Sequence, residues 1–225
     1  MPKLVYMKKY FLTFYLFILF MVLIYSQISA QVFGTMTDSR DGKKYRTIKI
    51  DKFELMAENL NYQNAGICYD NQKLFCQDYG RLYNINEIKN NICPAGWHVP
   101  TYSEWKYMFT KLNGKIENFT SGFTRLNVNG NPLNLKFSGF GNTDSFYGNS
   151  QNSISFLGIE ERGFYASSTT ASIKSNEREW EEWSVVRFEN FSDTDSKYKQ
   201  SDKSIYFLFG TSIGNYVSCR CMKDY

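Results

Sequence analysis

Five cysteines constrain this chain more than any other feature, because all of them follow a segment with the pattern of an export signal. Lys8 and Lys9 open this segment, and an apolar run broken only by Thr13 extends over residues 11–25. Residues 26–30 then read Ser-Gln-Ile-Ser-Ala. A basic start, an apolar run and a small-residue end are the features that signal peptidase recognises. We expect cleavage after Ala30, which makes residues 1–30 a signal peptide and residues 31–225 a single domain.

The alternative for the N-terminal segment is an uncleaved membrane anchor. Its apolar run is slightly long for a signal peptide, yet shorter than the roughly 20 residues that span a bilayer. No cysteine lies within residues 1–30, which excludes lipid attachment at an N-terminal cysteine. We therefore expect a secreted or cell-surface-associated protein that is not a lipoprotein and has no membrane span after cleavage.

Disulfides are the expected state of cysteines in an exported chain. The five cysteines are Cys68, Cys76, Cys93, Cys219 and Cys221. Their spacings are not those of a zinc site, and His98 is the only histidine, so we predict neither a metal nor a cofactor. An odd count leaves one thiol unpaired or paired with another chain, and spacing alone does not identify it.

The charge of the chain gives no reason to expect a nucleic-acid partner. The sequence contains 26 basic and 22 acidic residues, but three of the basic ones, Lys3, Lys8 and Lys9, lie in the leader. The remainder is close to neutral, so the basic balance comes largely from a segment that we expect to be removed. Binding to nucleic acid or to an anionic surface is therefore not indicated.

Apolar patterning predicts a mixed fold with several short strands. The segments predicted as strands are 43–50, 53–60 (or a short turn of helix), 183–188, 204–209 and 215–222. Residues 61–78 are loop-like. Residues 138–155 are rich in Gly, Asn and Ser with recurring aromatics, which indicates ordered loops and small strands rather than disorder. The prediction is an α+β fold with few helices, short antiparallel strands and long ordered loops.

The strongest local signal is a helix start at residue 101. Thr101 follows a proline, and Glu104 stands three residues later, the spacing of a capping box. Apolar residues follow at positions 105, 108, 109 and 112, which form one face of a helix of about three turns. We expect Trp105 to point into the core.

Several stretches together resemble a known bacterial family. They are Met56-Ala-Glu-Asn-Leu60, Tyr79-Gly-Arg-Leu-Tyr83, Cys93-Pro-Ala-Gly-Trp-His-Val-Pro100 with the helix start after it, Tyr165-Ala-Ser-Ser-Thr169 and Ser218-Cys-Arg-Cys-Met-Lys-Asp224. They resemble the Fibrobacter succinogenes major paralogous domain, an exported family, over almost the whole chain after the leader. The segment at 99–105 is also similar to formylglycine-generating-type domains of the C-type-lectin-like fold group. The resemblance implies a C-type-lectin-like mixed α+β fold whose terminal segments come together.

The resemblance also implies a cysteine pairing. Cys93 and Cys221 occupy the family's Cys-Pro and Arg-Cys positions, so their bridge is expected first, with Cys68–Cys76 as a second, local bridge. Cys219 stands where the family usually has an apolar residue, which makes it the candidate free thiol. A copper site at Cys219 and Cys221, as in formylglycine-generating enzymes, has no residue-by-residue support here.

The block from Trp97 to Trp105 has both a catalytic and a structural interpretation. His98 would have to serve any catalysis that needs a histidine. In the family, however, this position belongs to a structural block, so we predict packing roles for Trp97, His98, Thr101, Glu104 and Trp105, and no catalytic residue.

An acidic and aromatic cluster is the candidate binding patch. It consists of Glu179, Trp180, Glu182 and Trp183, on the hypothesis that exposed tryptophans beside carboxylates bind carbohydrate or peptide. A solvated charged face is the alternative. Calcium-dependent sugar binding is not indicated, because the usual Glu-Pro-Asn or Gln-Pro-Asn and Trp-Asn-Asp marks are absent and residues 142–144 offer a single carboxylate, Asp144.

These observations favour a non-catalytic binding module that recognises a glycan or a surface protein through loops on a lectin-like scaffold. Two alternatives stay open. One is an enzyme, either of the formylglycine-generating type or another extracytoplasmic hydrolase. The other is a structural subunit of a surface assembly.

Overall fold

The structure is a computed structural model of the whole chain, which divides into two compact units, Met1–Gln31 and Val32–Tyr225. The described residues are 14–15, 32–112, 115–118, 124–127, 133–143, 153–175, 178–189, 204–209 and 215–224; side chains are not described for 115–118, 124–127, 171–182, 188–189 and 204–209. In the first unit this covers only Phe14 and Tyr15, which are helical. The signal-peptide prediction therefore falls almost entirely outside the described residues.

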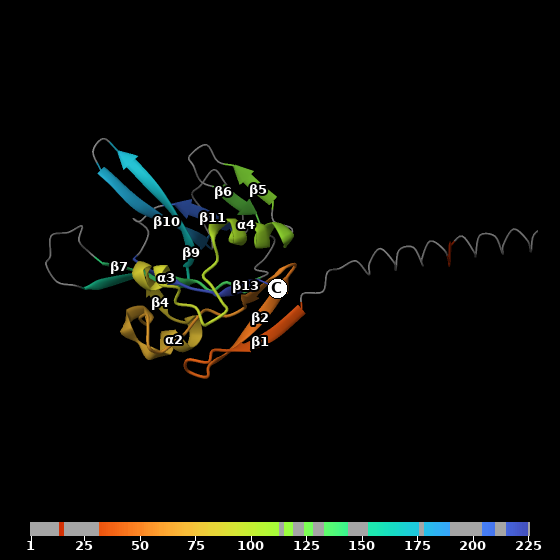
Figure 1. Ribbon diagram of the computed structural model, residues 1–225, viewed down its shortest axis with the longest axis horizontal. Coiled ribbons are helices and arrows are strands. Elements are labelled where there is room, and N and C mark those ends of the chain that lie inside the picture. The colour runs from red at the N-terminus through yellow and green to blue at the C-terminus, as the bar shows by residue number, and fades with distance from the viewer. Residues whose placement is uncertain are drawn as a thin grey trace, which may run out of the picture. The chain divides into compact units, whose positions relative to one another are not determined.

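The described part of the second unit contains short helices and many strands (Figure 1). The helices are the 3-10 helix η1 (Tyr69–Asn71), α2 (Lys73–Tyr79), α3 (Ile85–Lys89) and α4 (Tyr102–Lys111). The strands are β1 (Val32–Thr37), β2 (Lys44–Ile50), β3 (Phe53–Met56), β4 (Leu82–Asn84), β5 (Lys115–Asn118), β6 (Thr124–Asn127), β7 (Ser138–Thr143), β8 (Ile154–Ile159), β9 (Arg162–Ser175), β10 (Arg178–Glu189), β11 (Ser204–Phe209), β12 (Tyr216–Ser218) and β13 (Met222–Asp224). None of the helices in this part of the chain has the length and hydropathy to span a membrane.

The smaller sheet joins the two ends of the second unit. Its strand order is β1-β2-β3-β13, and all its pairings are antiparallel. Exposed and buried residues alternate over the first half of β2, where Tyr45 and Thr47 are buried and Lys44 and Arg46 are exposed; in the second half Ile48 and Ile50, on the opposite face, are also buried. The C-terminal strand β13 pairs with β3 through Met222 opposite Leu55. The sheet thus closes the fold with residues from both ends, as the family resemblance implies.

The larger sheet has the order β4-β12-β7-β9-β10-β11-β6-β5, with β8 paired to β7. Most pairings are antiparallel; the contacts of β9 with β7 and β12 are parallel. Few helices and mostly antiparallel strands make this an α+β fold. The predicted fold class is confirmed at that level.

Helix α4 connects the two sheets through the core. Thr101 and Glu104 form the predicted capping box, in which each side chain bonds the other residue's backbone N–H. Trp105, Met108 and Phe109 are fully buried and pack in one cluster with residues of both sheets. The indole N–H of Trp105 donates to the Ala166 carbonyl of β9, 3.0 Å away. A buried indole N–H needs such a partner, which fixes the helix on the sheet.

The structure corrects four of the predicted segments. Residues 61–78 are not all loop, because they contain η1 and most of α2. The strand predicted at 53–60 ends at Met56, and the one predicted at 215–222 is two short strands separated by residues 219–221. The strand predicted at 183–188 is part of the longer β10, which pairs with the unpredicted β9.

Candidate functional site

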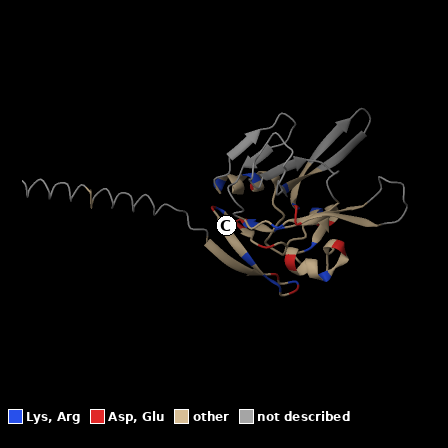
Figure 2. Ribbon diagram, turned by 180° about the vertical axis from the view of Figure 1, so that it is seen from behind, with Lys and Arg blue, Asp and Glu red and all other residues tan. Residues whose placement is uncertain are grey.

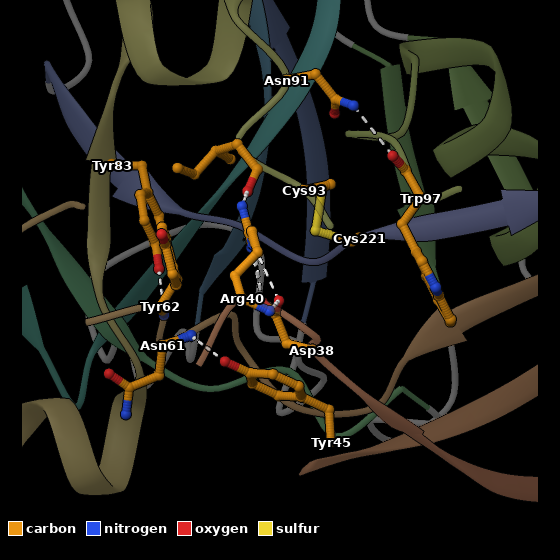
Figure 3. The surroundings of a disulfide bond; sticks show 11 residues. Asp38, Arg40, Tyr45, Asn61, Tyr62, Tyr83, Asn91, Cys93, Trp97 and Cys221 are labelled. Atoms are coloured by element: carbon orange, nitrogen blue, oxygen red, sulfur yellow. Dashed lines mark hydrogen bonds and ion pairs between the residues drawn. A yellow bond between two sulfur atoms is a disulfide. The ribbon is translucent and has the colours of Figure 1, made fainter. Parts of the chain in front are cut away.

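Two disulfides tie the described fold together, and Figure 3 shows one of them, Cys93–Cys221. Cys93–Cys221 joins residues 128 positions apart, with 5.6 Å between the Cα atoms. Cys68–Cys76 spans eight positions and attaches the loop before η1 to helix α2. Both are the pairs that the family resemblance implies. Cys219 is the free cysteine, and it is completely buried.

The three sulfur atoms of Cys93, Cys219 and Cys221 lie within 4.8 Å of one another. Two of them are bonded to each other, which leaves only the Cys219 thiol to act as a ligand or nucleophile. Burial raises the pKa of the Cys219 thiol to about 12. The reactive thiolate is therefore scarce at neutral pH, and the role of the three cysteines is structural. We call the Cys93–Cys221 disulfide the clasp.

A partly buried ion pair between Arg40 and Asp38 lies near the Cys93–Cys221 disulfide (Figure 3). Arg40 donates to both carboxylate oxygens of Asp38, to the Ile92 carbonyl at 2.7 Å, and stacks 4.0 Å from the Tyr62 ring centre. Burial alone would raise the pKa of Asp38, but the hydrogen bonds and charge of Arg40 outweigh it and lower that pKa. Arg40 therefore ties the turn after β1 to the segment that carries Cys93.

The predicted structural block lies between the clasp and α4. Trp97 is buried, and its carbonyl accepts from Asn91 Nδ2 at 3.1 Å. The backbone of His98 exchanges two 2.8 Å hydrogen bonds with Met222, and its Nε2 lies 3.3 Å from Glu104 Oε1. Glu104 is already engaged in the helix cap. These contacts join the helix start to β13, and the packing roles of the block stay a prediction.

The predicted Trp180–Trp183 patch is wrong for one of its two tryptophans. Trp183 is 6% exposed and lies in the second core cluster, where the Lys89 ammonium lies 5.0 Å from its ring centre. Residues 183–186 are all buried, and successive side chains of a strand point to opposite faces, so both faces of β10 are covered at this point. The side chains of Glu179, Trp180 and Glu182 lie outside the described residues. Asp144, from the discounted calcium segment, is also outside them.

The structure shows a polar pocket that was not predicted from the sequence. Its cavity has a volume of about 270 Å³, and its lining comes from residues of four segments, at 43–46, 57–61, 76–80 and 134–136. We call this cavity the polar pocket. The first segment is the start of β2 with Lys43 before it, the third is the end of α2 with Gly80 after it, and the other two are the connections after β3 and before β7. No single stretch of sequence carries more than a few of these residues.

Two asparagines hold one wall of the pocket in place through hydrogen bonds to the backbone of α2. Asn59 Nδ2 donates to the Tyr79 carbonyl at 2.8 Å, and Asn61 Nδ2 donates to the Cys76 carbonyl at 2.6 Å. Gly80 ends α2 with φ of 77°, and a Cβ there would lie 2.7 Å from the Asn59 Cβ, so the site requires glycine. Helix α2 and its disulfide thus hold one wall against the asparagines.

Charged groups surround the same pocket, and Figure 2 shows both signs on the β1–β2 hairpin and the nearby helices. The basic lining residues are Lys43, Lys44, Arg46 and Lys136, and the acidic ones are Glu58 and Asp78. Arg46 Nε donates to Glu58 Oε1 at 3.0 Å, so this pair neutralises itself. The only sequence signal for the site was the basic run at 43–46, which an exposed strand face explains equally well.

Comparison with known proteins identifies the family of this chain. A family model described as the Fibrobacter succinogenes major domain matches residues 34–223, which span both sheets, both disulfides and the polar pocket. No curated protein and no solved structure matches the chain. The chain belongs to the Fibrobacter succinogenes major domain family.

Proposed function

We propose that this protein is an exported, non-catalytic binding module that recognises a glycan through the polar pocket. The observation that carries the proposal is the pocket itself. It is concave, and amide, hydroxyl, ammonium and carboxylate groups converge on it from four segments. Small-ligand sites are concavities in which a few placed polar groups fix the orientation of the ligand.

The lining suits a ligand rich in hydroxyl groups. The side-chain amides of Asn61 and Asn134, which are half-buried and exposed, can donate and accept hydrogen bonds as sugar hydroxyls do, whereas the amide of the buried Asn59 is already bonded to Tyr79 and Arg220. Tyr79 adds a half-buried aromatic ring, the kind of surface against which carbohydrate rings stack. The volume of about 270 Å³ is near the lower end for ligand pockets. A terminal or single sugar ring is therefore a better fit than the extended surface of a protein partner.

Export is part of the same proposal. Residues 1–30 act as a signal peptide cleaved after Ala30, and the domain is secreted or retained at the cell surface without a lipid anchor. The two disulfides support an oxidising compartment, since such bridges persist outside the cytosol. We further propose that the α+β fold is a C-type-lectin-like scaffold, on which loops and strand ends form the pocket.

A binding screen of the oxidised protein tests this function. The protein is applied to an array of bacterial and plant-type oligosaccharides and to a panel of surface proteins, with and without calcium. We expect saturable binding to a saccharide class that does not require calcium. Turnover of a saccharide would instead support a hydrolase, and selective capture of a surface protein with no saccharide bound would support a structural subunit.

A further inference from the structure

A buried positive charge is hydrogen-bonded to two of the residues that line the polar pocket. Arg220 is fully buried. Its Nε donates to Asn59 Oδ1 at 2.9 Å, and its Nη2 donates to the Asn134 carbonyl at 2.6 Å. Its Nη1 donates to the Leu133 carbonyl and, more weakly, to the Met56 carbonyl at 3.5 Å. Every one of these partners is neutral. Among the described residues no carboxylate forms an ion pair with this guanidinium.

The position of Arg220 directs its charge toward the pocket. Asn59 and Asn134, which accept its hydrogen bonds, are both lining residues, so the guanidinium is one residue removed from the cavity. Burial lowers the pKa of Arg220, yet an arginine keeps its proton in proteins. A charge in a poorly solvated interior is screened less than one on the surface. The floor of the pocket is therefore electropositive.

The rim adds cations of the same sign. Lys43, Lys44 and Lys136 are exposed lining residues, and their ammonium groups make no ion pair with a described carboxylate. Although Lys43 is exposed as a residue, partial loss of water around its ammonium group lowers its pKa. Asp78 is the one lining carboxylate that lies outside the Arg46–Glu58 pair. Positive charge thus dominates both the floor and the rim.

We infer that the polar pocket holds the anionic group of an acidic saccharide, with the oxyanion above the Asn59–Asn134 floor and between the Lys43 and Lys136 ammonium groups. This inference rests on the proposed function and specifies its ligand class. A carboxylate, sulfate or phosphate on the sugar supplies the same chemistry, namely an oxyanion attracted to the Lys43 and Lys136 ammonium groups and to the charge of Arg220. The sugar hydroxyls engage the amide and tyrosine groups of the wall.

Matched saccharide pairs separate the charge from the sugar. The probes are oligogalacturonate and its methyl ester, sialyllactose and lactose, and a sulfated oligosaccharide with its desulfated form. Binding is measured by calorimetry on the oxidised protein at two salt concentrations. We expect at least one acidic member to bind, its neutral partner to bind at least tenfold more weakly, and the acidic affinity to fall as salt rises.

Variants assign the effect to the pocket. Lys43→Gln combined with Lys136→Gln removes two rim charges and should weaken acidic binding roughly tenfold, the size expected for two partly exposed charge contacts. Lys73→Gln combined with Lys106→Gln removes the same charge from residues that do not line the pocket and should leave binding unchanged. Both variants must keep the wild-type melting temperature.

The outcomes distinguish this inference from the proposed function. Equal binding of acidic and neutral partners refutes the inference and leaves a glycan-binding function standing. Acidic preference that the Lys43 and Lys136 variant retains places the anion elsewhere and also refutes the inference. Absence of binding to every probe, acidic and neutral, together with a negative saccharide array, contradicts both.

Discussion

Arg220 Nη2 lies 2.6 Å from the carbonyl oxygen of Asn134, a residue 86 positions earlier in the chain. The contact joins residues 219–221, which connect β12 of the larger sheet to β13 of the smaller one, to the connection before β7. Asn134 also lines the polar pocket. Asn134 has a φ of 50°, a left-handed conformation that asparagine tolerates better than most residues. One buried side chain therefore supports both the fold and the site.

Replacement of Arg220 should be costly to stability. Arg220→Met keeps most of the side-chain length but leaves Asn59 Oδ1 and the Leu133 and Asn134 carbonyls without their donor. We expect the free energy of unfolding to fall by about 3 kcal/mol or more, since each buried acceptor loses a charged partner. Urea denaturation measures this. Arg46→Met, at an exposed ion pair, is the control and should cost about 1 kcal/mol or less; equal losses in the two variants would contradict the structure.

The Cys219 thiol should be protected in the folded protein. It is completely buried, so a thiol reagent added at pH 7–8 without a reductant should label almost nothing until denaturant is added, when one thiol per chain should react. Rapid labelling of one equivalent in the native state would mean that Cys219 is exposed, or that another cysteine is free.

Burial of that thiol also makes stability depend on pH. Because the pKa of Cys219 is raised from 9.0 to about 12, the unfolded chain loses this proton first as pH rises. The contribution of the protonated Cys219 thiol to the free energy of unfolding is complete below pH 9. It is lost between pH 9 and about 12, where the free energy of unfolding falls by roughly 1.4 kcal/mol per pH unit. Cys219→Ala should show a shallower decline in unfolding free energy between pH 9 and 10.5 than the parent. Parallel curves would show that Cys219 titrates normally.

If Cys221 is removed, Cys93 should form a disulfide with Cys219 instead. Cys221→Ser breaks a disulfide between residues 128 positions apart. The reduced entropy of the unfolded chain makes such a bridge worth about 5 kcal/mol of stability. The Cys219 sulfur lies within 4.8 Å of that of Cys93, so we expect unreduced peptide maps of this variant to contain Cys93–Cys219. Cys219→Ser with Cys221→Ser removes both options and should be the less stable variant. A free Cys93 in the single variant would contradict this expectation.

Trp183 should behave as a core residue and not as a ligand contact. Trp183→Ala removes a side chain that is 6% exposed and should lower the free energy of unfolding by about 3–5 kcal/mol. Leu74→Ala, at a residue that is 62% exposed, is the control and should change it by less than about 1 kcal/mol. A Trp183→Ala protein of unchanged melting temperature would restore the surface interpretation.

Local signals explain which parts of the fold were predictable from the sequence. The helix at Thr101 was predicted because its cap, its apolar face and its length all agree within a dozen residues. Helix α2 was missed because Gln72 makes no side-chain cap and only Cys76 is buried along it. Its disulfide to Cys68 holds it in place, and that constraint is visible only once the pairing is known.

The site was missed for a different reason. Its lining comes from segments up to about ninety positions apart, and its charged floor comes from Arg220, which in the sequence is only the residue between two cysteines. The prediction that Trp183 is exposed failed for a similar reason. The local sequence of a strand does not reveal which of its faces will be covered by other parts of the fold. Long-range pairing decides both, and no local pattern encodes it.

The location of a bound acidic saccharide tests the central claim most directly. Backbone amide shifts are recorded by NMR while the tightest acidic probe is titrated into the oxidised protein. We predict that the largest perturbations fall on residues 43–46, 77–80 and 134–136, which surround the pocket above Arg220. Perturbations centred on another surface, with these segments unchanged, would contradict the account.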